Sequence, residues 1–406
     1  MKPLYKTVAL CWLGWVFDFY DLILIAFLIP AVDASFHVTM DTGAWLIGSG
    51  LAASGIGGIL FGWLADQRGR KPVLMMTVLL YSAGMMLTSQ AHDTTQFLGA
   101  RFLTGLGLGG EWAVGHALIA ESVPAETRAR WSAFLQSGEP VGVALASIVG
   151  FMAAPVLGWR MVFLLSGLTG FLALMFRRYL SESPMWQQRT VVSTKQRLSE
   201  LRAFFPQYGP LMLLAFILAV LKLGTYWTCY TWLPRFISQS FGKAVGQSVL
   251  WMLLGQLGQF IGMYLFGYTA DRLGRRVAFT AFSLLTACAL LPMALYWQTL
   301  FQDYPALFWL CIFTMGIGSG CTAGFGALLA EIFPTDQRTL AMGMVYNLGR
   351  GVQLFAPVVV AMAVNHDGLR GGLLVPVTLA VLTAGWVWTL PERTGRPLFH
   401  EHVPTA

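Results

Sequence analysis

Charged residues are scarce in this sequence. Asp, Glu, Lys and Arg make up only 11% of its 406 residues, whereas 56% of the residues are hydrophobic. A soluble globular domain carries roughly 25% charged residues, so this composition excludes an ordinary soluble protein. Cysteine is also rare, and the five cysteines lie in apolar stretches without CxxC or Cys/His spacing. A disulfide framework and a metal site are therefore not expected, and we predict an integral membrane protein.

Two local patterns imitate known motifs but lack their essential parts. The run after MKPLYK has no small-residue cleavage site and contains Asp18 and Asp21, so we interpret it as a spanning helix and not as a signal peptide. The GLGLGG run at residues 105–110 has no preceding strand and no following Gly-Lys-Ser/Thr, which excludes a phosphate loop. Neither a nucleophile with its base nor a metal cluster is evident, so an enzyme is not expected.

Long apolar stretches occupy most of the chain. A helix that crosses a bilayer needs ~20 mainly apolar residues, and twelve stretches qualify. An even number places both termini on one side, and 19 Lys and Arg residues fall on that side against four on the other. The positive-inside rule therefore predicts cytoplasmic termini, and this topology explains the net charge of +7 without a nucleic-acid partner. The predicted spans are residues 8–30, 44–65, 71–90, 95–120, 131–154, 160–179, 209–234, 247–270, 276–298, 306–332, 339–363 and 370–390.

Three motifs recur in the same order in the two halves of the chain, at offsets of 205 to 210 residues. GWLADQRGRK from Gly62 recurs as GYTADRLGRR from Gly267, LIAESVPAETR from Leu118 as LLAEIFPTDQR from Leu328, and LSES from Leu180 as LPER from Leu390. The repetition predicts an all-α membrane fold of two pseudo-symmetric six-helix bundles, residues 1–180 and 209–406, joined by a cytoplasmic linker over 181–208. Transporters with parallel repeats bind substrate between the halves, near the bilayer midplane.

These motifs resemble those of the major facilitator superfamily over the whole chain. DFYD at residues 18–21 is similar to the Asp-x-x-Asp of its aromatic-acid and sialate proton symporters. GGEWAVG and SAFLQSGEPVG most resemble the sialate branch. The resemblance implies a transporter that rocks one half against the other. The positions that match the superfamily signatures are Gly62, Asp66, Arg68, Gly69, Arg70, Lys71, Arg101, Gly105, Gly107, Gly110 and Glu111.

Charged residues at the helix ends form two matched sets. Opposite charges that face one loop layer can pair, each pair contributing ~0 to 1 kcal/mol if exposed and more within a network. In the superfamily such a network holds the cytoplasmic side shut, and we predict the same here; the alternative is that these charges only fix topology. The sets are Asp66, Arg70, Glu121, Arg128 and Glu182, and Asp271, Arg275, Glu331, Arg338 and Glu392.

Seven ionisable residues lie within the predicted spans, with His116 beside them at the end of the fourth span. Asp18 and Asp21 share one helix face, where two neighbouring buried carboxylates favour the retention of a proton. The resemblance implies Asp21 as the proton carrier and Arg101 as its regulating cation, while Asp18 tunes Asp21 or bonds a neighbouring helix. The alternative is a permanent Asp21–Arg101 salt bridge. The remaining four are Glu111, Glu139, Lys222 and Arg350.

Arg350 is the predicted anchor of an anionic substrate, because its planar fork suits a carboxylate. The alternative is that it pairs with Glu139, Glu111 or Asp18 across the interface. Lys222 is a second candidate cation. The other candidate substrate contacts could equally serve as packing or as polar ties between helices. They are Tyr346, Asn347, Gln353, Tyr226, Gln136, Glu139, Gln256, Gln259, Glu111 and Trp112.

Together these features predict a secondary transporter that imports a small organic anion with protons. The expected substrate is a monocarboxylate such as sialate, lactate or an aromatic or shikimate-type acid. A proton-driven exporter, a neutral-sugar symporter and a non-transporting membrane sensor are the alternatives; exporters of the superfamily carry Gly-Pro-x-x-Gly on helix 5, where this chain has SGEPVG. We expect a monomer in the inner membrane, with the proton as coupling ion and no other cofactor.

Overall fold

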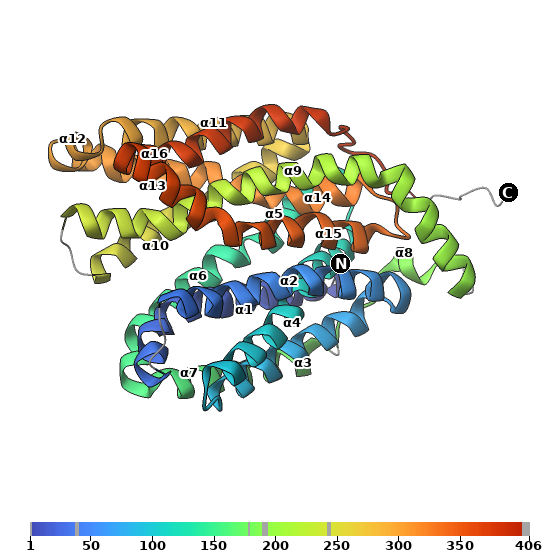
Figure 1. The fold of residues 1–406 in the computed structure, drawn as a ribbon. Helices are drawn as coiled ribbons and strands as arrows, with labels where there is room; N and C mark the ends of the chain where they lie inside the picture. Colours follow the sequence, from blue (N-terminus) through green and yellow to red (C-terminus); the bar gives the residue numbers. More distant parts are fainter. Residues whose placement is uncertain (1, 37–39, 178, 189–193, 242–244, 400–406) are drawn as a thin grey trace.

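The computed structural model describes residues 2–36, 40–177, 179–188, 194–241 and 245–399. This part of the chain is helical and contains no strand (Figure 1), which confirms the all-α class. The first half comprises α1 (Lys2–Phe36), α2 (Met40–Arg68), α3 (Arg70–Ser89), α4 (Thr94–Ser122), α5 (Arg128–Gln136), α6 (Gly138–Ile148) and α7 (Ala154–Arg177). After α8 (Pro184–Gln187), the second half comprises α9 (Thr194–Phe241), α10 (Val245–Leu273), α11 (Arg275–Leu295), α12 (Trp297–Gln302), α13 (Pro305–Ser319), α14 (Gly324–Ile332), α15 (Arg338–Gly351) and α16 (Ala356–Trp386). Short 3-10 or π segments, η1 (Ala125–Thr127), η2 (Val149–Ala153), η3 (Gly320–Ala323), η4 (Val352–Phe355) and η5 (Val387–Thr389), connect some of them.

Glycines with positive φ mark the repeat in the backbone. Gly69 separates α2 from α3 with a φ of 101°, and Gly274 separates α10 from α11 with a φ of 96°. Only glycine adopts such angles without steric cost. The two corresponding loop motifs therefore make the same sharp turn, as expected for duplicated halves.

Eight segments of the described chain are long and apolar enough to cross a membrane. Two of them, residues 125–171 and 338–389, are far longer than one crossing needs. Each contains a non-helical turn, at Gly158 and at Asp367–Gly368. The number of twelve spans stays a prediction. The predicted linker boundary at residue 208 does not coincide with a helix end, because α9 continues from the linker into the next span.

The helices form two groups that meet along α2 and α15 and along α5 and α10 (Figure 1). Glycines allow this close approach. A Cβ at Gly343 would lie 2.2 Å from the carbonyl oxygen of Gly58, and one at Gly62 would lie 2.7 Å from that of Thr339. Such backbone contacts bring the halves together without bulky side chains between them.

Helix α4 should tolerate a methyl group at one glycine and not at another. A Cβ at Gly109 would lie 2.0 Å from the Ser54 carbonyl oxygen. A Cβ at Gly99 would meet no atom within 4 Å among the described residues, apart from the adjoining backbone of its own helix. We expect Gly109→Ala to destabilise the protein by about 1–3 kcal/mol through overpacking, and Gly99→Ala to have no such effect. Thermal unfolding of both variants in detergent tests this. Equal melting temperatures would contradict the tight α2–α4 contact.

Candidate functional site

Asp21 on α1 and Arg101 on α4 form a buried ion pair within the first half. Nη1 of Arg101 lies 2.9 Å and 3.0 Å from the two carboxylate oxygens of Asp21. Their exposed fractions are 0% and 1%, and Asp18 is also fully buried. The structure thus brings together the two residues that the sequence analysis linked. Asp21 and Arg101 both belong to the first half, so their ion pair can persist while the two halves move against each other.

Arg350 on α15 is a buried cation without a hydrogen-bonding partner in the described part of the chain. It is 1% exposed, and none of its three guanidinium nitrogens makes a hydrogen bond. Its guanidinium carbon lies 5.2 Å from the ring of Phe19 and 6.0 Å from that of Trp15, both on α1. The structure therefore shows no hydrogen bond from Arg350 to Glu139, Glu111 or Asp18, although the charge of Arg350 acts on Glu139. Arg350 faces the aromatic surface of the helix that carries Asp18 and Asp21.

Lys222 on α9 is the second such cation. It is 1% exposed, and its Nζ makes no hydrogen bond within the described residues. A buried charge without a partner is costly, and such residues within a membrane are usually functional. Arg350 and Lys222 both belong to the second half, opposite the Asp21–Arg101 pair. The charge asymmetry expected between the halves is therefore present in the structure.

Glu139, in the first turn of α6, accepts hydrogen bonds from both halves. Gln136 Nε2 of the first half lies 2.7 Å from its Oε2, and Gln259 Nε2 of α10 lies 2.9 Å from its Oε1. The Tyr226 hydroxyl of α9 is a further hydrogen-bonding partner. Three predicted substrate contacts thus converge on one carboxyl group. They form a polar bridge between the halves.

Several other predicted substrate contacts are engaged in ties between helices. Asn347 Nδ2 donates to the Gly109 carbonyl oxygen at 2.8 Å, across the halves. Gln353 Nε2 donates to the carbonyl oxygens of Val220 and Gly349. The Oε2 atom of Glu111 accepts from Thr77 of α3 at 3.0 Å, inside the first half. These contacts favour the tie interpretation for all three.

Trp112 and Tyr346 join the halves through their rings. The ring centroids lie 3.7 Å apart with an interplanar angle of 6°, and Trp112 Nε1 also donates to Gln136 at 3.0 Å. Gln256 is buried on α10, and its side-chain amide lies beside the Tyr226 hydroxyl. It stays a candidate for substrate contact.

Trp15 and Phe19 are the neighbours of Arg350 that sequence reasoning missed. They lie four residues apart on one face of α1, and Phe19 stands between the two aspartates. Their rings meet edge to face at 5.0 Å. The sequence did contain a signal for these two residues, because aromatic residues four positions apart share a helix face and this pair overlaps the DFYD motif. Within the described residues, no cluster of His, Cys, Asp or Glu could hold a metal ion.

The two predicted charge sets form one layer at the junction of the halves, which we call the ion-pair layer. Arg70 pairs with Glu121 at 2.9 Å, and its counterpart Arg275 pairs with Glu331 at 2.7 Å. Each acid also accepts from the opposite half: Arg338 reaches Glu121 at 2.9 Å and Arg128 reaches Glu331 at 3.0 Å. Glu182 and Glu392 accept from the backbone at the starts of α3 and α11.

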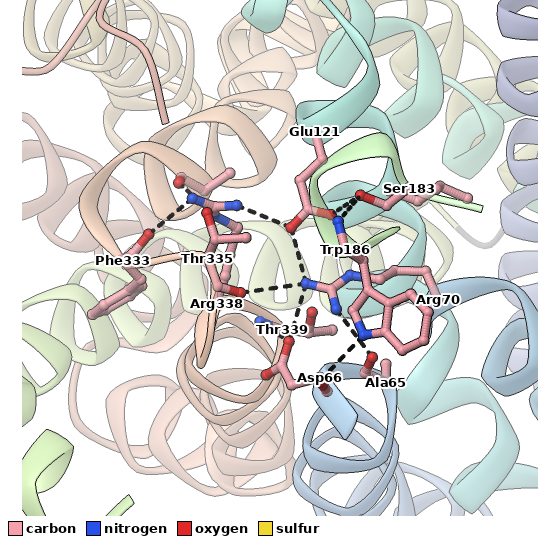
Figure 2. Close-up of polar contacts among 12 residues, drawn as sticks. Ala65, Asp66, Arg70, Glu121, Ser183, Trp186, Phe333, Thr335, Arg338 and Thr339 are labelled. Atoms are coloured by element: carbon pink, nitrogen blue, oxygen red, sulfur yellow. Dashed lines mark hydrogen bonds and ion pairs between the residues drawn. The ribbon is translucent and has the colours of Figure 1, made fainter. Parts of the chain in front are cut away.

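Backbone groups complete the layer. Asp66 accepts from the N–H groups of Thr339 and Leu340 at the start of α15, and Asp271 accepts from those of Ala129 and Arg130 at the start of α5. Figure 2 shows Glu121 between the guanidiniums of Arg70 and Arg338, with Ser183 on its second oxygen. A carboxylate at a helix N-terminus is favoured by the helix dipole. The layer therefore joins the halves through charge and through helix ends.

Three acids of this layer have shifted pKa values, and the hydrogen bonds that Glu392 accepts lower its pKa despite partial burial. Burial raises the pKa of Asp66 from 3.8 to about 6, despite the nearby Arg70. Burial would also raise the pKa of Glu121, but Arg70 and Arg338 outweigh it and hold that pKa below its usual value. Between pH ~4 and ~6 the closed layer therefore holds a proton on Asp66 that an exposed carboxylate would release. Protonation of Asp66 therefore shifts the equilibrium toward the closed layer as the pH falls from ~6 to ~4.

Removal of the charge of Glu121 should loosen the layer. In Glu121→Gln, two buried guanidiniums from opposite halves lose their shared anion, and breaking a buried pair costs about 3–5 kcal/mol. We expect faster hydrogen exchange of residues 333–340, measured by mass spectrometry. Asp367→Asn is the matched control, because its 3.7 Å pair with Arg370 is 52–59% exposed and should contribute little. Unchanged exchange in Glu121→Gln would contradict a closing role for the layer.

A duplicated helical fold with buried charges at the junction of its halves defines a membrane carrier. The family model of the Major Facilitator Superfamily matches residues 11–323 and 236–405. The chain belongs to this superfamily, which confirms the resemblance drawn from its motifs. It is therefore a transporter and not an enzyme.

Curated relatives match almost the whole chain. It is 32% identical to a protein of Haemophilus influenzae named for metabolite transport, with 95% of each chain covered. It is 31% identical to a Cupriavidus pinatubonensis protein named as a 4-methylmuconolactone transporter, with 96% and 91% covered. It is 30% identical to the sialic acid transporter NanX of Escherichia coli, with 93% and 91% covered. The apolar helices and these bacterial relatives support a multi-pass protein of the inner membrane.

Solved structures agree with the fold. The proton:xylose symporter XylE bound to 6-bromo-6-deoxy-D-glucose superposes with a TM-score of 0.80 at 19% identity, covering 98% of both chains. The human organic anion transporter MFSD10 gives a TM-score of 0.76 at 17% identity, covering 95% of this chain and 99% of the other. At such identities the likeness concerns the fold alone.

Proposed function

We propose that this protein imports a small organic anion together with protons. The observation that carries the proposal is the buried Arg350, whose guanidinium makes no hydrogen bond in the described part of the chain and lies against Phe19 and Trp15. A carboxylate would supply the missing acceptor in a bidentate geometry. Lys222 provides a second positive charge in the same half.

Proton coupling follows from the separation of the two charge sites. Asp21 would carry the proton beside Arg101 in the first half, while the anion binds Arg350 in the second. The anion would pair with Arg350, and the proton would neutralise Asp21 and free Arg101 from its ion pair. A carrier that holds the proton without the anion would keep both guanidiniums unpaired in a low-dielectric path, which resists reorientation. Helix α1 carries both the proton acceptor and the rings that face Arg350, so it is the element that links the two events.

The ion-pair layer serves as the cytoplasmic gate in this proposal. Nineteen Lys and Arg residues fall on the side of the termini, which favours the cytoplasm for that side. The closed layer shuts the path to the cytoplasm, and its opening releases the substrate there. One chain contains both halves and both charge sites, so a monomer suffices for the cycle.

The alternatives are less well supported. A neutral sugar gives Arg350 no counter-charge, which disfavours a sugar symporter. An exporter of cationic drugs would have to place a cation beside Arg350 and Lys222, where like charges repel. A sensor that binds solute without moving it has no use for a proton site and a gate on separate helices. An organic anion fits all of these features.

Purified protein in liposomes, with a pH dye inside, tests the proposal. Sialate, 4-methylmuconolactone, lactate, shikimate and benzoate are added in turn, with xylose and a cationic drug as controls. Protein-free liposomes correct for passive entry of protonated weak acids. Protein-dependent acidification driven by one of the anions supports the proposal and identifies a substrate. Proton movement driven only by xylose or by the drug would refute it.

A further inference from the structure

His116 is a buried titratable residue that the proposed proton and anion sites do not use. It lies on α4, is 2% exposed, and faces α14 of the opposite half. A Cβ at Gly326 would lie 1.9 Å from its Nδ1, so the ring occupies the space that this glycine leaves. Glu121 of the ion-pair layer follows five residues later, about 7.5 Å along the helix. His116 therefore lies beneath the gate, at the junction of the halves.

Hydrogen-bond chemistry fixes the proton on one ring nitrogen. Trp112 Nε1 can only donate, and it lies 3.0 Å from the Oε1 atom of Gln136, which sets the orientation of that amide. His116 Nε2 lies 3.0 Å from the same oxygen. Because an amide oxygen only accepts, Nε2 must carry a hydrogen. Nδ1 is then the atom at which His116 can gain or lose a proton.

Ser132 connects Nδ1 to the opposite half. Its Oγ lies 3.3 Å from His116 Nδ1 and 2.8 Å from the carbonyl oxygen of Ala323. A hydroxyl group has one hydrogen. At 2.8 Å that hydrogen belongs to the bond with Ala323, which crosses the halves. Nδ1 of a neutral His116 therefore lies beside the Ser132 oxygen without receiving a hydrogen from it.

Among the described residues, no charged side chain makes a hydrogen bond or an ion pair with this ring. The groups that face the ring are Trp112 on its own helix, Ser132 and Gln136 on α5, Ala323 in η3 and Gly326 on α14. The nearest ionisable groups in this network, Glu139 and Tyr346, act only through Gln136 and Trp112. A buried imidazolium would therefore lack an anion, which is costly. Burial without a nearby anion therefore favours neutral His116 in the closed arrangement.

We propose that His116 is a second proton-binding site, which takes up a proton from the cytoplasm only while the gate is open and must release it before the gate closes. The site is distinct from Asp21, which lies beyond it along the path. The role of this site as a brake on transport rests on the function proposed above. A proton symporter acidifies the cytoplasm, and a protonated His116 would hold the carrier open and idle under that condition.

Linkage gives the size of the expected effect. In this proposal, opening of the gate would expose His116 to water, where an unperturbed imidazole has a pKa of about 6.5. If the closed state accepts only neutral His116, the open-to-closed ratio grows by about tenfold as the pH falls from 7.5 to 5.5. Asp66 acts in the opposite direction, because its closed form holds a proton. The effect of His116 is therefore the difference between the wild type and a variant that differs only at this residue.

Hydrogen exchange of the full-length protein in lipid nanodiscs tests the proposal without any substrate. Exchange of residues 128–136 and 323–332 is measured at pH 7.5 and 5.5, with intrinsic rates calibrated on an unstructured peptide. Relative to His116→Gln, the wild type should open about tenfold more at pH 5.5. His116→Asn repeats the test if the larger amide disturbs folding, and His92→Gln, at an exposed position just before α4, should behave as the wild type does.

The outcomes separate this proposal from the function on which its physiological role rests. Equal pH dependence in wild type and His116 variants would overturn it, and so would a wild type that closes more than the variants at pH 5.5. Neither result concerns proton coupling at Asp21, which the liposome measurement tests alone. Conversely, a carrier that moves no protons could still open more at pH 5.5 than its His116 variants do. In that case the proton-binding site would stand, and only its role as a brake on symport would be wrong.

Discussion

Arg350→Ala is expected to abolish measurable binding of the transported anion. The variant removes the buried cation that faces Phe19 and Trp15. Truncating one partner of a buried, hydrogen-bonded charge pair costs about 2–5 kcal/mol or more, which corresponds to a loss in affinity of roughly 30-fold to several thousandfold. Intrinsic tryptophan fluorescence is a suitable readout, because Trp15 lies beside the site. The anion that drives acidification in liposomes is the ligand to titrate.

Two controls define the role of Arg350. Arg350→Lys keeps the charge but loses the planar fork, so an intermediate loss indicates bidentate recognition, whereas full activity indicates that charge alone suffices. Arg370→Ala removes an exposed arginine of the same half and should bind as the wild type does. If Arg350→Ala retains wild-type affinity, the anion does not bind at this guanidinium and the proposed site is wrong.

Asp21→Asn should uncouple transport from protons. Asparagine has nearly the same shape and can still accept a hydrogen bond from Arg101, but it cannot bind and release a proton. We expect substrate-driven acidification to fall to the level of protein-free liposomes. Exchange of labelled for unlabelled anion across the membrane should continue, because a loaded carrier can reorient without net proton movement.

The comparison with Asp18→Asn assigns the proton to one of the two buried carboxyls. Asp18 lies one turn before Asp21 and is equally buried, whereas Asp21 forms the ion pair with Arg101 at 2.9 Å. Asp18→Asn should therefore retain acidification. Undiminished proton uptake by Asp21→Asn would show that the Asp21–Arg101 pair is a permanent salt bridge, and loss in Asp18→Asn alone would move the proton site to Asp18.

The sequence predicts the fold and the ion-pair layer well, for physical reasons. Bilayer thickness turns long apolar runs into helices, and the repeated motifs identify matched loops. The paired charges follow because Arg70, Glu121 and their counterparts lie at helix ends that face one layer. The pairing of Asp21 with Arg101 came from the family resemblance, and the structure shows their contact.

Contacts between helices of different halves could not be predicted in the same way. Sequence spacing places side chains on a helix face but does not give the rotation of that helix against a partner far along the chain. Asn347 shows the difference: it shares a helix with Arg350, yet it bonds the backbone of α4. The convergence of Gln136 and Gln259 on Glu139 depends on how α5 and α10 meet, which no local pattern specifies.

The crossed ion pairs of the layer have a consequence for the ancestry of the protein. Glu121 of the first half takes Arg338 of the second, and Glu331 of the second takes Arg128 of the first. This reciprocity is the rule of an isologous dimer, in which residue i meets j and j meets i. Two copies of a half-length ancestor could have made the same contacts across a twofold axis. Asp21, Arg101, Lys222 and Arg350 each belong to one half only, so the layer keeps the symmetry of the duplication and the buried charges of the centre depart from it.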